Sequence, residues 1–299
     1  MIARRTDLAA EACRMWQEAA GETTKLPGVK ARTEQADGFE LEWVEVLNGE
    51  GEAAIGKPKG IYVSIDISPL IRREEGAFSR AAELLARKLR EILKLRDGGC
   101  VLVCGLGNSA ITPDNIGPAA AKQTIATRHL IEKMPEDFAA FRPAAVIEAG
   151  VLGTTGVESA EIVKAMTEKL KPEAIIAVDA LAARKMARIC RSLQISDAGI
   201  VPGSGVGNAR SELSKNTLGV PVIAIGVPTV VDAATLAADI MEQAGVEAES
   251  ADLADFGGKM VVTPREIDTQ AADCAKLIAY GINMALHGIS FEDAAMLMQ

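Results

Sequence analysis

CVLVCGLGNSAITPDNIGP, residues 100–118, is the stretch that decides the fold, because it joins a buried-strand pattern to a glycine turn and an acidic loop. Residues 100–104 are a continuous apolar run, which is typical of a strand covered on both faces of a parallel sheet. The tripeptide TPD at 112–114 then carries the signals of a helix start. We therefore expect Asp114 just beyond the carboxyl end of a strand, where open α/β sheets place their sites.

The same pattern recurs along the chain. Apolar strands are predicted at 144–149, 174–178 and 220–226, with helices of about a dozen residues between them. Asp179 directly follows the second of these strands, and the DALAAR that it opens predicts a helix start. The alternation indicates an α/β fold whose mainly parallel sheet is flanked by helices on both faces.

The amino-terminal part has a different pattern. Residues 39–46 (FELEWVEV) and 61–67 (IYVSIDI) alternate apolar and polar, which predicts half-exposed strands that are antiparallel or lie at a sheet edge. Residues 48–60 hold four Gly and one Pro and are expected to form a loop. Residues 1–38 are predicted to be a polar arm with a short helix near 8–20. Nothing marks a linker, so 1–299 is expected to be a single α/β domain.

Composition excludes several classes of function. The 299 residues are 48% hydrophobic and carry a net charge of −9, so no broad basic surface is available to bind nucleic acid. No run of about 18 apolar residues appears, and charged residues interrupt the first residues where a signal peptide would need its apolar segment. We expect a cytoplasmic protein without a membrane segment.

Metal-binding patterns are also missing. The cysteines show no CxxC spacing, two of them lie within the predicted strand at 100–104, and all are interpreted as buried thiols. His129 lies in a predicted helix and His287 near a helix end, neither in a metal-ligand spacing. The sequence predicts neither a metal nor another cofactor.

Three aspartates share one position relative to the predicted strands. Asp114, Asp179 and Asp232 each follow an apolar strand within about ten residues, and parallel strands bring such loops to one edge of the sheet. If two of these carboxylates approach closely, repulsion raises one pKa, so that one acts as an acid and the other as a base toward water. The alternative is that each Asp only caps the helix that follows it.

Two glycine-rich loops allow a binding function. Residues 105–110 (GLGNSA) resemble the start of a nucleotide fingerprint, but Ala110 replaces its third glycine, which disfavours a dinucleotide site. Residues 204–210 (SGVGNAR) can offer backbone N–H groups to a carbonyl or an anion, and can equally form a tight turn.

At this point the sequence resembles the germination proteases of spore-forming bacteria, which degrade the small acid-soluble proteins that coat spore DNA. The matching segments are RTDLAAEA at 5–12, GLGNSAITPDNIGP at 105–118, GTTGVES at 153–159, VDALAAR at 178–184, ISDAGIVPGSGVGNAR at 195–210 and LGVPVIAIGVPTVVDAATL at 218–236.

The resemblance implies an endopeptidase with a two-aspartate mechanism, in which Asp114 of TPDNIG and Asp179 of VDALAAR are catalytic. The fold implied is phosphorylase/hydrolase-like and similar to that of hydrogenase maturation peptidases, whose corresponding acids hold a metal together with a histidine. Neither His129 nor His287 falls in a matching segment, so the metal-free version is favoured. Candidate substrate-binding or supporting residues are Asn108, Thr112, Glu158, Ser204, Asn208 and Asp232.

The resemblance further implies a zymogen, a homotetramer and action in the spore core on small acid-soluble spore proteins. Only Met1 to Arg4 precede Arg5, so we expect a very short propeptide or a start close to the mature end, with the arm able to occlude the site. Two alternatives stay open: a metal-dependent maturation peptidase, and a non-catalytic protein that uses the glycine-rich loops to bind a small anion or nucleotide.

Overall fold

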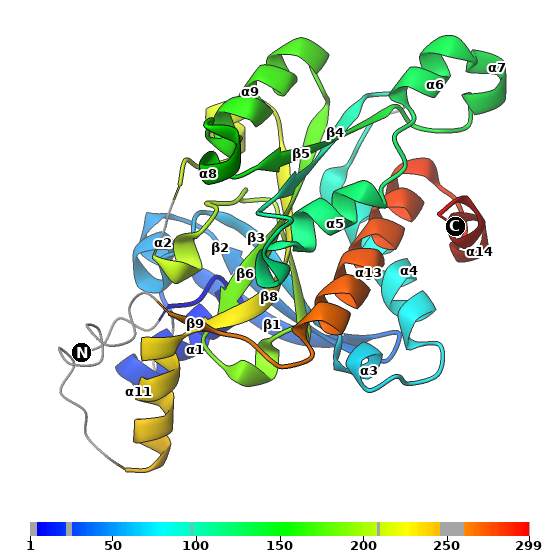
Figure 1. Ribbon diagram of the computed structural model, residues 1–299. Coiled ribbons are helices and arrows are strands. Elements are labelled where there is room, and N and C mark those ends of the chain that lie inside the picture. The colour runs from blue at the N-terminus through cyan, green and yellow to red at the C-terminus, as the bar shows by residue number, and fades with distance from the viewer. Residues whose placement is uncertain (1–4, 22–25, 97, 208–209, 246–259, 299) are drawn as a thin grey trace.

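The computed structural model of the chain describes residues 5–21, 26–96, 98–207, 210–245 and 260–298. Its centre is a nine-stranded sheet with helices packed on both faces (Figure 1). The strands follow the order β1-β2-β3-β7-β8-β6-β4-β5, and β9 pairs with β8 outside this path. Their bounds are β1 Val29–Ala36, β2 Phe39–Val46, β3 Gly60–Asp66, β4 Val101–Leu106, β5 Ala144–Gly150, β6 Ala174–Ala183, β7 Ser192–Ser196, β8 Val222–Asp232 and β9 Val261–Val262.

Helices of very different lengths join these strands. The α-helices are α1 Ala9–Ala20, α2 Gly49–Ile55, α3 Ser68–Ile71, α4 Ala77–Leu93, α5 Ile116–Lys122, α6 Arg128–Lys133, α7 Pro135–Phe138, α8 Leu152–Thr155, α9 Ser159–Leu170, α10 Lys215–Leu218, α11 Ala233–Gln243, α13 Ile267–His287 and α14 Phe291–Leu297. Three short 3-10 turns are η1 Thr112–Asp114, η2 Met186–Arg188 and η3 Ser204–Val206. Among the described helices, none combines the length and the apolar character that crossing a membrane requires.

The predicted parallel core is confirmed. Strands β5, β4, β6 and β8 pair in parallel, and β4 and β6 read as continuous apolar runs because both faces are covered. Side chains of α4, α5 and α13 pack on one face of these strands, and α9 packs on the other. The α/β fold class predicted from the sequence is therefore correct.

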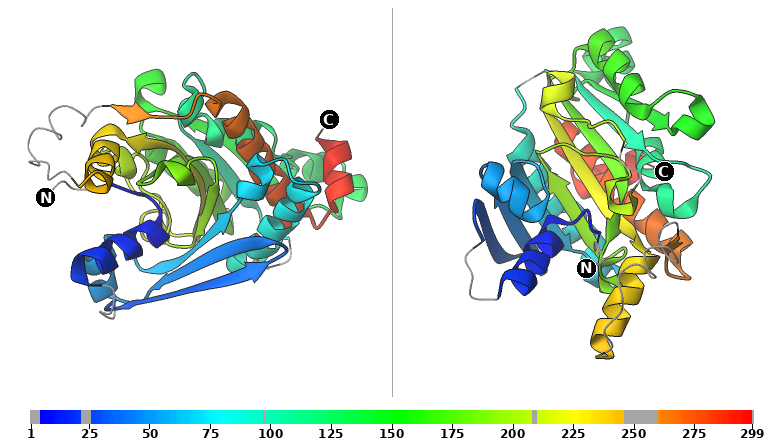
Figure 2. Two further views of the ribbon diagram at one scale, coloured as in Figure 1. Left: turned by 90° about the horizontal axis from the view of Figure 1, so that it is seen from below. Right: turned by 90° about the vertical axis from the view of Figure 1, so that its left-hand side faces the viewer.

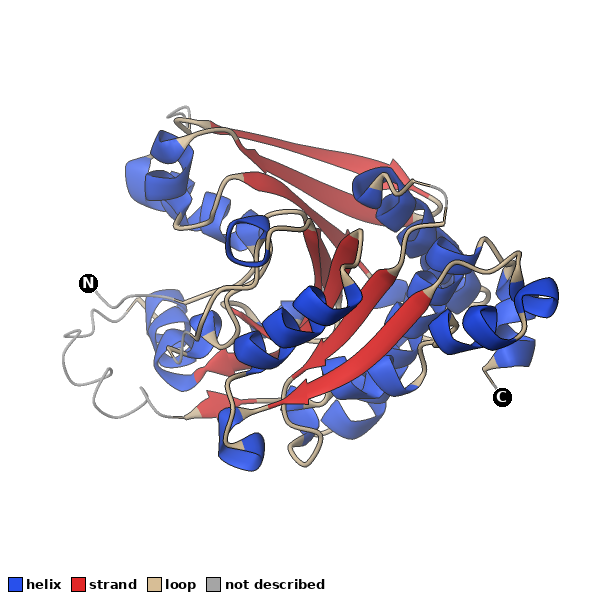
Figure 3. Ribbon diagram, turned by 90° about the horizontal axis from the view of Figure 1, so that it is seen from above, coloured by secondary structure: helices blue, strands red, loops and turns tan. Residues whose placement is uncertain are grey.

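The antiparallel half of the sheet is also confirmed and is larger than expected. β1 to β3 pair in sequence, and β7 joins them to β8, again in antiparallel pairing. The sheet twists strongly between its two edge strands, as two further views show (Figures 2 and 3). α1 and α2 pack together on the face of this half that carries Val44 and Tyr62.

Several local predictions were wrong. Residues 29–36, assigned to the polar arm, form β1, whose exposed edge position explains its polar sequence. The predicted loop 48–60 contains α2, which Asn48 caps by accepting hydrogen bonds from Glu50 N and Gly51 N. The single helix expected between the strands at 100–104 and 144–149 is broken into α5 and α6, because Thr127 N donates to Ala144 O at 3.0 Å instead of continuing a helix.

Strands β6 and β8 extend beyond their predicted ends. The segment expected to begin a helix after Asp179 continues as strand to Ala183, and the strand predicted at 220–226 continues to Asp232. The two strands pair along their whole extension, from Asp179 opposite Gly226 to Ala183 opposite Val231. Pairing between buried strands here overrides the helix propensity of the alanines.

Candidate active site

Asp179 lies within β6, where its side chain is 4% exposed. By alternation along the strand it shares a face with Ile175 and Ala177, which pack in the cluster that includes Val163 of α9. Its Oδ1 accepts a hydrogen bond from Ala180 N at 2.9 Å. Within the described part of the chain no cation forms an ion pair with it, so this carboxyl group is buried with little compensation for a negative charge.

Asp114 ends η1, the turn that follows β4, and β4 is the parallel neighbour of β6. Its Oδ2 accepts a hydrogen bond from Asn108 N at 2.8 Å. Gly107 has φ 107° and lies so close that a Cβ there would be 2.2 Å from the Asp114 carbonyl oxygen. The turn is held from the other side by Thr229, whose hydroxyl donates to Pro113 O at 2.6 Å. These three contacts together fix the position of the Asp114 carboxylate.

The two carboxyl groups interact electrostatically. Burial raises the pKa of Asp179 well above its usual range, and the negative charge of Asp114 raises it further. Burial also raises the pKa of Asp114, but the Asn108 N–H and the positive charge of Arg210 lower it. Since the more buried group has the weaker compensation, the pair favours a protonated Asp179 beside an ionised Asp114.

Asp7 is a third carboxylate at this edge of the sheet, and the sequence analysis did not select it. Its N–H donates to Ala182 O and its Oδ2 accepts from Ala182 N, both at 2.8 Å. Ser204 Oγ donates to its Oδ1 at 2.6 Å. These bonds hold the amino-terminal segment along β6, beyond the point where β4 stops pairing with that strand.

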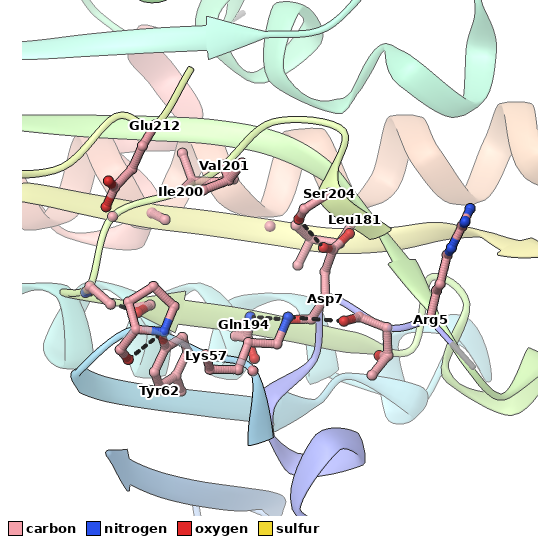
Figure 4. Close-up of a pocket in the computed structure, with 18 residues that line it drawn as sticks. Arg5, Asp7, Lys57, Tyr62, Leu181, Gln194, Ile200, Val201, Ser204 and Glu212 are labelled. Carbon is pink, nitrogen blue, oxygen red and sulfur yellow. Dashed lines mark hydrogen bonds between the residues drawn. The ribbon is translucent and has the colours of Figure 1, made fainter. Parts of the chain in front are cut away.

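A cavity of about 340 Å³ opens on the sheet face that carries Asp179. Gln194, Gly226 and Asp179 occupy one row across β7, β8 and β6, and the first two line the cavity. Leu181 covers Gly226, since a Cβ on that glycine would be 2.5 Å from the leucine side chain. Figure 4 shows Arg5 and Asp7 at the side of this cavity.

Lys57 projects into the same cavity from the turn after α2 (Figure 4). Its Nζ donates to Thr6 O at 2.9 Å. Burial lowers the pKa of this amine, against the opposing effect of the Asp7 and Glu11 carboxylates. The cavity therefore contains both carboxylate and amine groups, and residues 5–7 fill one side of it.

The other predicted site residues are dispersed. Asn108 contacts Asp114 through its backbone, whereas Ser204 contacts Asp7. Thr112 starts η1, and its carbonyl accepts a hydrogen bond from Asn115 N. Asn208 lies outside the described residues.

Glu158 and Asp232 lie at helix starts. Glu158 precedes α9, and its Oε2 is buried without a hydrogen-bond partner in the described residues. Asp232 Oδ1 accepts from Thr235 N at 2.9 Å, which makes it the N-cap of α11. Asp232 is six positions along β8 from Gly226, the partner of Asp179, or about 20 Å at 3.3 Å per residue. Asp232 therefore fits the alternative in which an aspartate only caps the helix that follows it. Asp114 and Asp179, in contrast, lie at the same edge of the sheet, on and after the neighbouring strands β6 and β4.

Arg210 is the other charged residue that the sequence analysis missed. Its positive charge lowers the pKa of both Asp114 and Asp179. A signal was present, because Asp7 and Arg210 each lie in a segment that matches the resembled family, 5–12 and 195–210. In the described part of the chain, no three His, Cys, Asp or Glu side chains form a group suited to a metal ion.

Comparison with known proteins gives the family. The family model for germination protease, Peptidase_A25, matches residues 7–245. A germination protease of Clostridium tetani is 40% identical over 97% of both chains, and one of Caldanaerobacter subterraneus is 40% identical over 94% of both. One of Bacillus cereus is 34% identical over 95% of this chain and 93% of the relative.

A [NiFe] hydrogenase maturation protease from Thermococcus kodakarensis is similar in structure over 64% of this chain and 98% of that protein, with a TM-score of 0.36 and 18% identity. The sequence relatives cover nearly the full length of the chain, and the family model matches the segments that carry Asp7, Asp114, Asp179 and Arg210. The chain belongs to the germination protease family.

Proposed function

We propose that this protease hydrolyses peptide bonds with Asp114 as general base and Asp179 as general acid. The observation that carries the proposal is the placement of two carboxyl groups on adjacent parallel strands: Asp179 is buried within β6, just past the last residue that pairs with β4, and Asp114 is half-buried in the turn after β4. The environments push the two pKa values apart, which is the condition for assigning acid and base.

The reaction balances with these two groups alone. Asp114 takes a proton from a water molecule whose oxygen bonds to the carbonyl carbon of the peptide. Asp179 gives its proton to the amide nitrogen as the C–N bond breaks, which releases an amine and a carboxylic acid. Arg210, whose charge lowers the pKa of both groups, stabilises the negative charge that develops on the carbonyl oxygen. Transfer of the proton from Asp114 to Asp179 then restores the starting state.

We propose small acid-soluble spore proteins as the substrates and the spore core as the place of action. Family membership supports a protein substrate. The net charge of −9 also suits this assignment, because an acidic protease does not compete with its DNA-bound substrate for the DNA phosphates. The homotetramer implied by the family resemblance stays a prediction that sedimentation velocity would test.

The decisive experiment is cleavage of a purified small acid-soluble spore protein by the wild type, Asp114→Asn and Asp179→Asn, each with and without a chelator. We expect the wild type to cut in chelator and both variants to lose roughly 10²–10⁴ in rate, the usual contribution of a general acid or base. Retained cutting by both variants would sink the aspartate assignment. Cutting that stops in chelator and returns with zinc or nickel would instead favour the metal-dependent alternative.

A further inference from the structure

A second cavity, of about 510 Å³, lies at the opposite end of the parallel strands from Asp114 and Asp179. Its walls are the C-terminal ends of α4 and α13, Gly98 before β4, and residues 139–142 before β5. Figure 1 shows the end of α13 on the same side of the molecule as α6 and α7. The proposed reaction uses none of these residues.

The lining of this cavity is basic on one side and apolar on the other. Arg90, Lys94 and Arg142 supply three cations, and none of the described residues that line it is acidic. Phe141 and Leu286 contribute apolar surface. Such a concentration of positive charge is unusual in a chain whose net charge is −9.

The cations of this cavity are incompletely neutralised. Arg142 Nη1 donates to Gly99 O at 2.9 Å and lies 3.6 Å from Glu173 Oε2, so its charge is partly balanced. Arg90 Nη1 donates to Met284 O at 3.0 Å, a carbonyl in the last turn of α13 that also accepts the N–H of Gly288. Within the described chain neither Arg90 nor Lys94 has a carboxylate partner. Two positive charges are thus available to a ligand.

His287 adds a buried group without a full set of partners. It is 7% exposed, its Nε2 lies 3.4 Å from Ile125 O, and its Nδ1 has no hydrogen-bond partner in the described residues. Its ring packs on Phe141 with the centroids 5.3 Å apart. Burial, helped by the charge of Arg142, lowers its pKa to about 4. With Nε2 donating to Ile125 O, a protonated ring would need an acceptor for its Nδ1–H.

We propose that this cavity binds a small organic anion, with its carboxylate or phosphate head against Arg90, Lys94 and Arg142 and its apolar body against Phe141 and Leu286. The volume lies within the range of small-molecule sites. An anionic head neutralises the free cations and favours the protonated form of His287, whereas a neutral molecule does neither.

Calorimetric titration at constant ionic strength tests the ligand class with inorganic phosphate, benzoate and its neutral analogue benzamide. We expect benzoate to bind at least tenfold more tightly than benzamide. Lys94→Gln, which removes one cation from an exposed position, should weaken benzoate binding about tenfold. Lys164→Gln on α9, on the other face of the sheet, is the matched control and should leave binding unchanged.

NMR of the two histidines gives a second measurement. It reports on the site itself, so a general loss of surface charge in a variant cannot produce the same result. Bound benzoate should raise the pH at which His287 titrates by at least one unit and leave the resonances of His129 unchanged. Binding of phosphate but not benzoate would favour an inorganic anion over the organic class. Equal affinity for benzoate and benzamide, equal affinity of the Lys94→Gln and Lys164→Gln variants, or an unmoved His287 would overturn the proposal.

Discussion

In the proposed mechanism the charge of Asp179 affects both the stability of the protein and its catalysis. Its pKa is raised in the folded state, so the folded protein binds more protons than the unfolded chain as pH rises above the usual carboxyl range. The free energy of unfolding contributed by this group therefore falls as pH rises from about 4 through its folded pKa. Asp179→Asn removes the charge and keeps an oxygen for the Ala180 N–H, so its free energy of unfolding should lack this decline.

Urea unfolding of the wild type and Asp179→Asn between pH 4 and 8 measures the difference. The variant should equal or exceed the wild type in stability at the upper end while losing cleavage. If the free energy of unfolding had the same pH dependence in both proteins, ionisation of Asp179 would cost the folded state little stability. That result would contradict the acid role proposed for Asp179.

Asp232 offers a contrast between a structural and a catalytic aspartate. Its carboxylate caps α11 through Thr235 N and Thr235 Oγ1, at 2.9 and 3.0 Å. Asp232→Ala should lower the free energy of unfolding by about 1 kcal/mol, the usual value of an N-cap, and leave the rate of cleavage within twofold. Thermal unfolding and initial rates check this, and a hundredfold loss of rate at full stability would return Asp232 to the active site.

Among the strands and helices, prediction from the sequence succeeded where the hydrophobic pattern extends over a whole element. It failed where pairing with a neighbouring strand determines the conformation of the backbone. The apolar runs of β4 and of residues 174–178 in β6 suffice to predict their type. The extension of β6 past Asp179 could not be predicted, because its alanines favour helix and only the partner strand β8 selects an extended backbone.

The residues of the candidate site could likewise be predicted only in part. Asp114 and Asp179 follow or lie in recognisable buried strands, and sequence order alone brings such positions to one edge of a parallel sheet. Asp7 is remote in sequence and reaches the site through a backbone pairing with Ala182, while Arg210 reaches it through an irregular loop. Neither placement produces a hydrophobic periodicity in the sequence from which it could have been predicted.

Gly117 determines how closely α5 approaches the sheet, and hence where η1 holds Asp114. A Cβ at this position would be 2.2 Å from Leu106 O and 2.4 Å from Val178 O, both backbone atoms that cannot turn away. Gly117→Ala should cost about 1–3 kcal/mol of unfolding free energy by overpacking. Displacing Asp114 by about 1 Å should also reduce cleavage on the order of 10²-fold.

Gly153→Ala is the matched control, because a Cβ there meets nothing within 4 Å in helix α8. It should preserve both stability and rate, as measured by chemical unfolding and initial velocities. If Gly117→Ala were as active and stable as Gly153→Ala, α5 would have to move without consequence, and the account of how Asp114 is positioned would be wrong.

In the whole molecule, the amino-terminal segment is attached to the sheet edge that carries Asp114 and Asp179. Lys57 beyond α2, Ser204 of η3 and Ala182 of β6 each bond to residues 6–7, so this segment ties both halves of the sheet together. The cavity on the Asp179 face is lined on one side by residues 5–7. A substrate chain that runs along β6 toward the aspartates would have to displace them.

A chain that begins at Leu8 should therefore cleave protein substrate faster than the full chain. Leu8 is 1% exposed within the core and is kept, so the fold is expected to persist, while the bonds from Asp7 to Ala182 and Ser204 are lost. We expect a lower KM and at least a tenfold gain in kcat/KM, with Asp179→Asn in the shortened chain inactive. Ser204→Ala in the full chain removes one bond to Asp7 and should give a smaller gain in the same direction. If the shortened chain folds, as judged by circular dichroism, and cleaves no faster, residues 5–7 do not occlude the site, and the segment serves to bridge the two halves of the sheet.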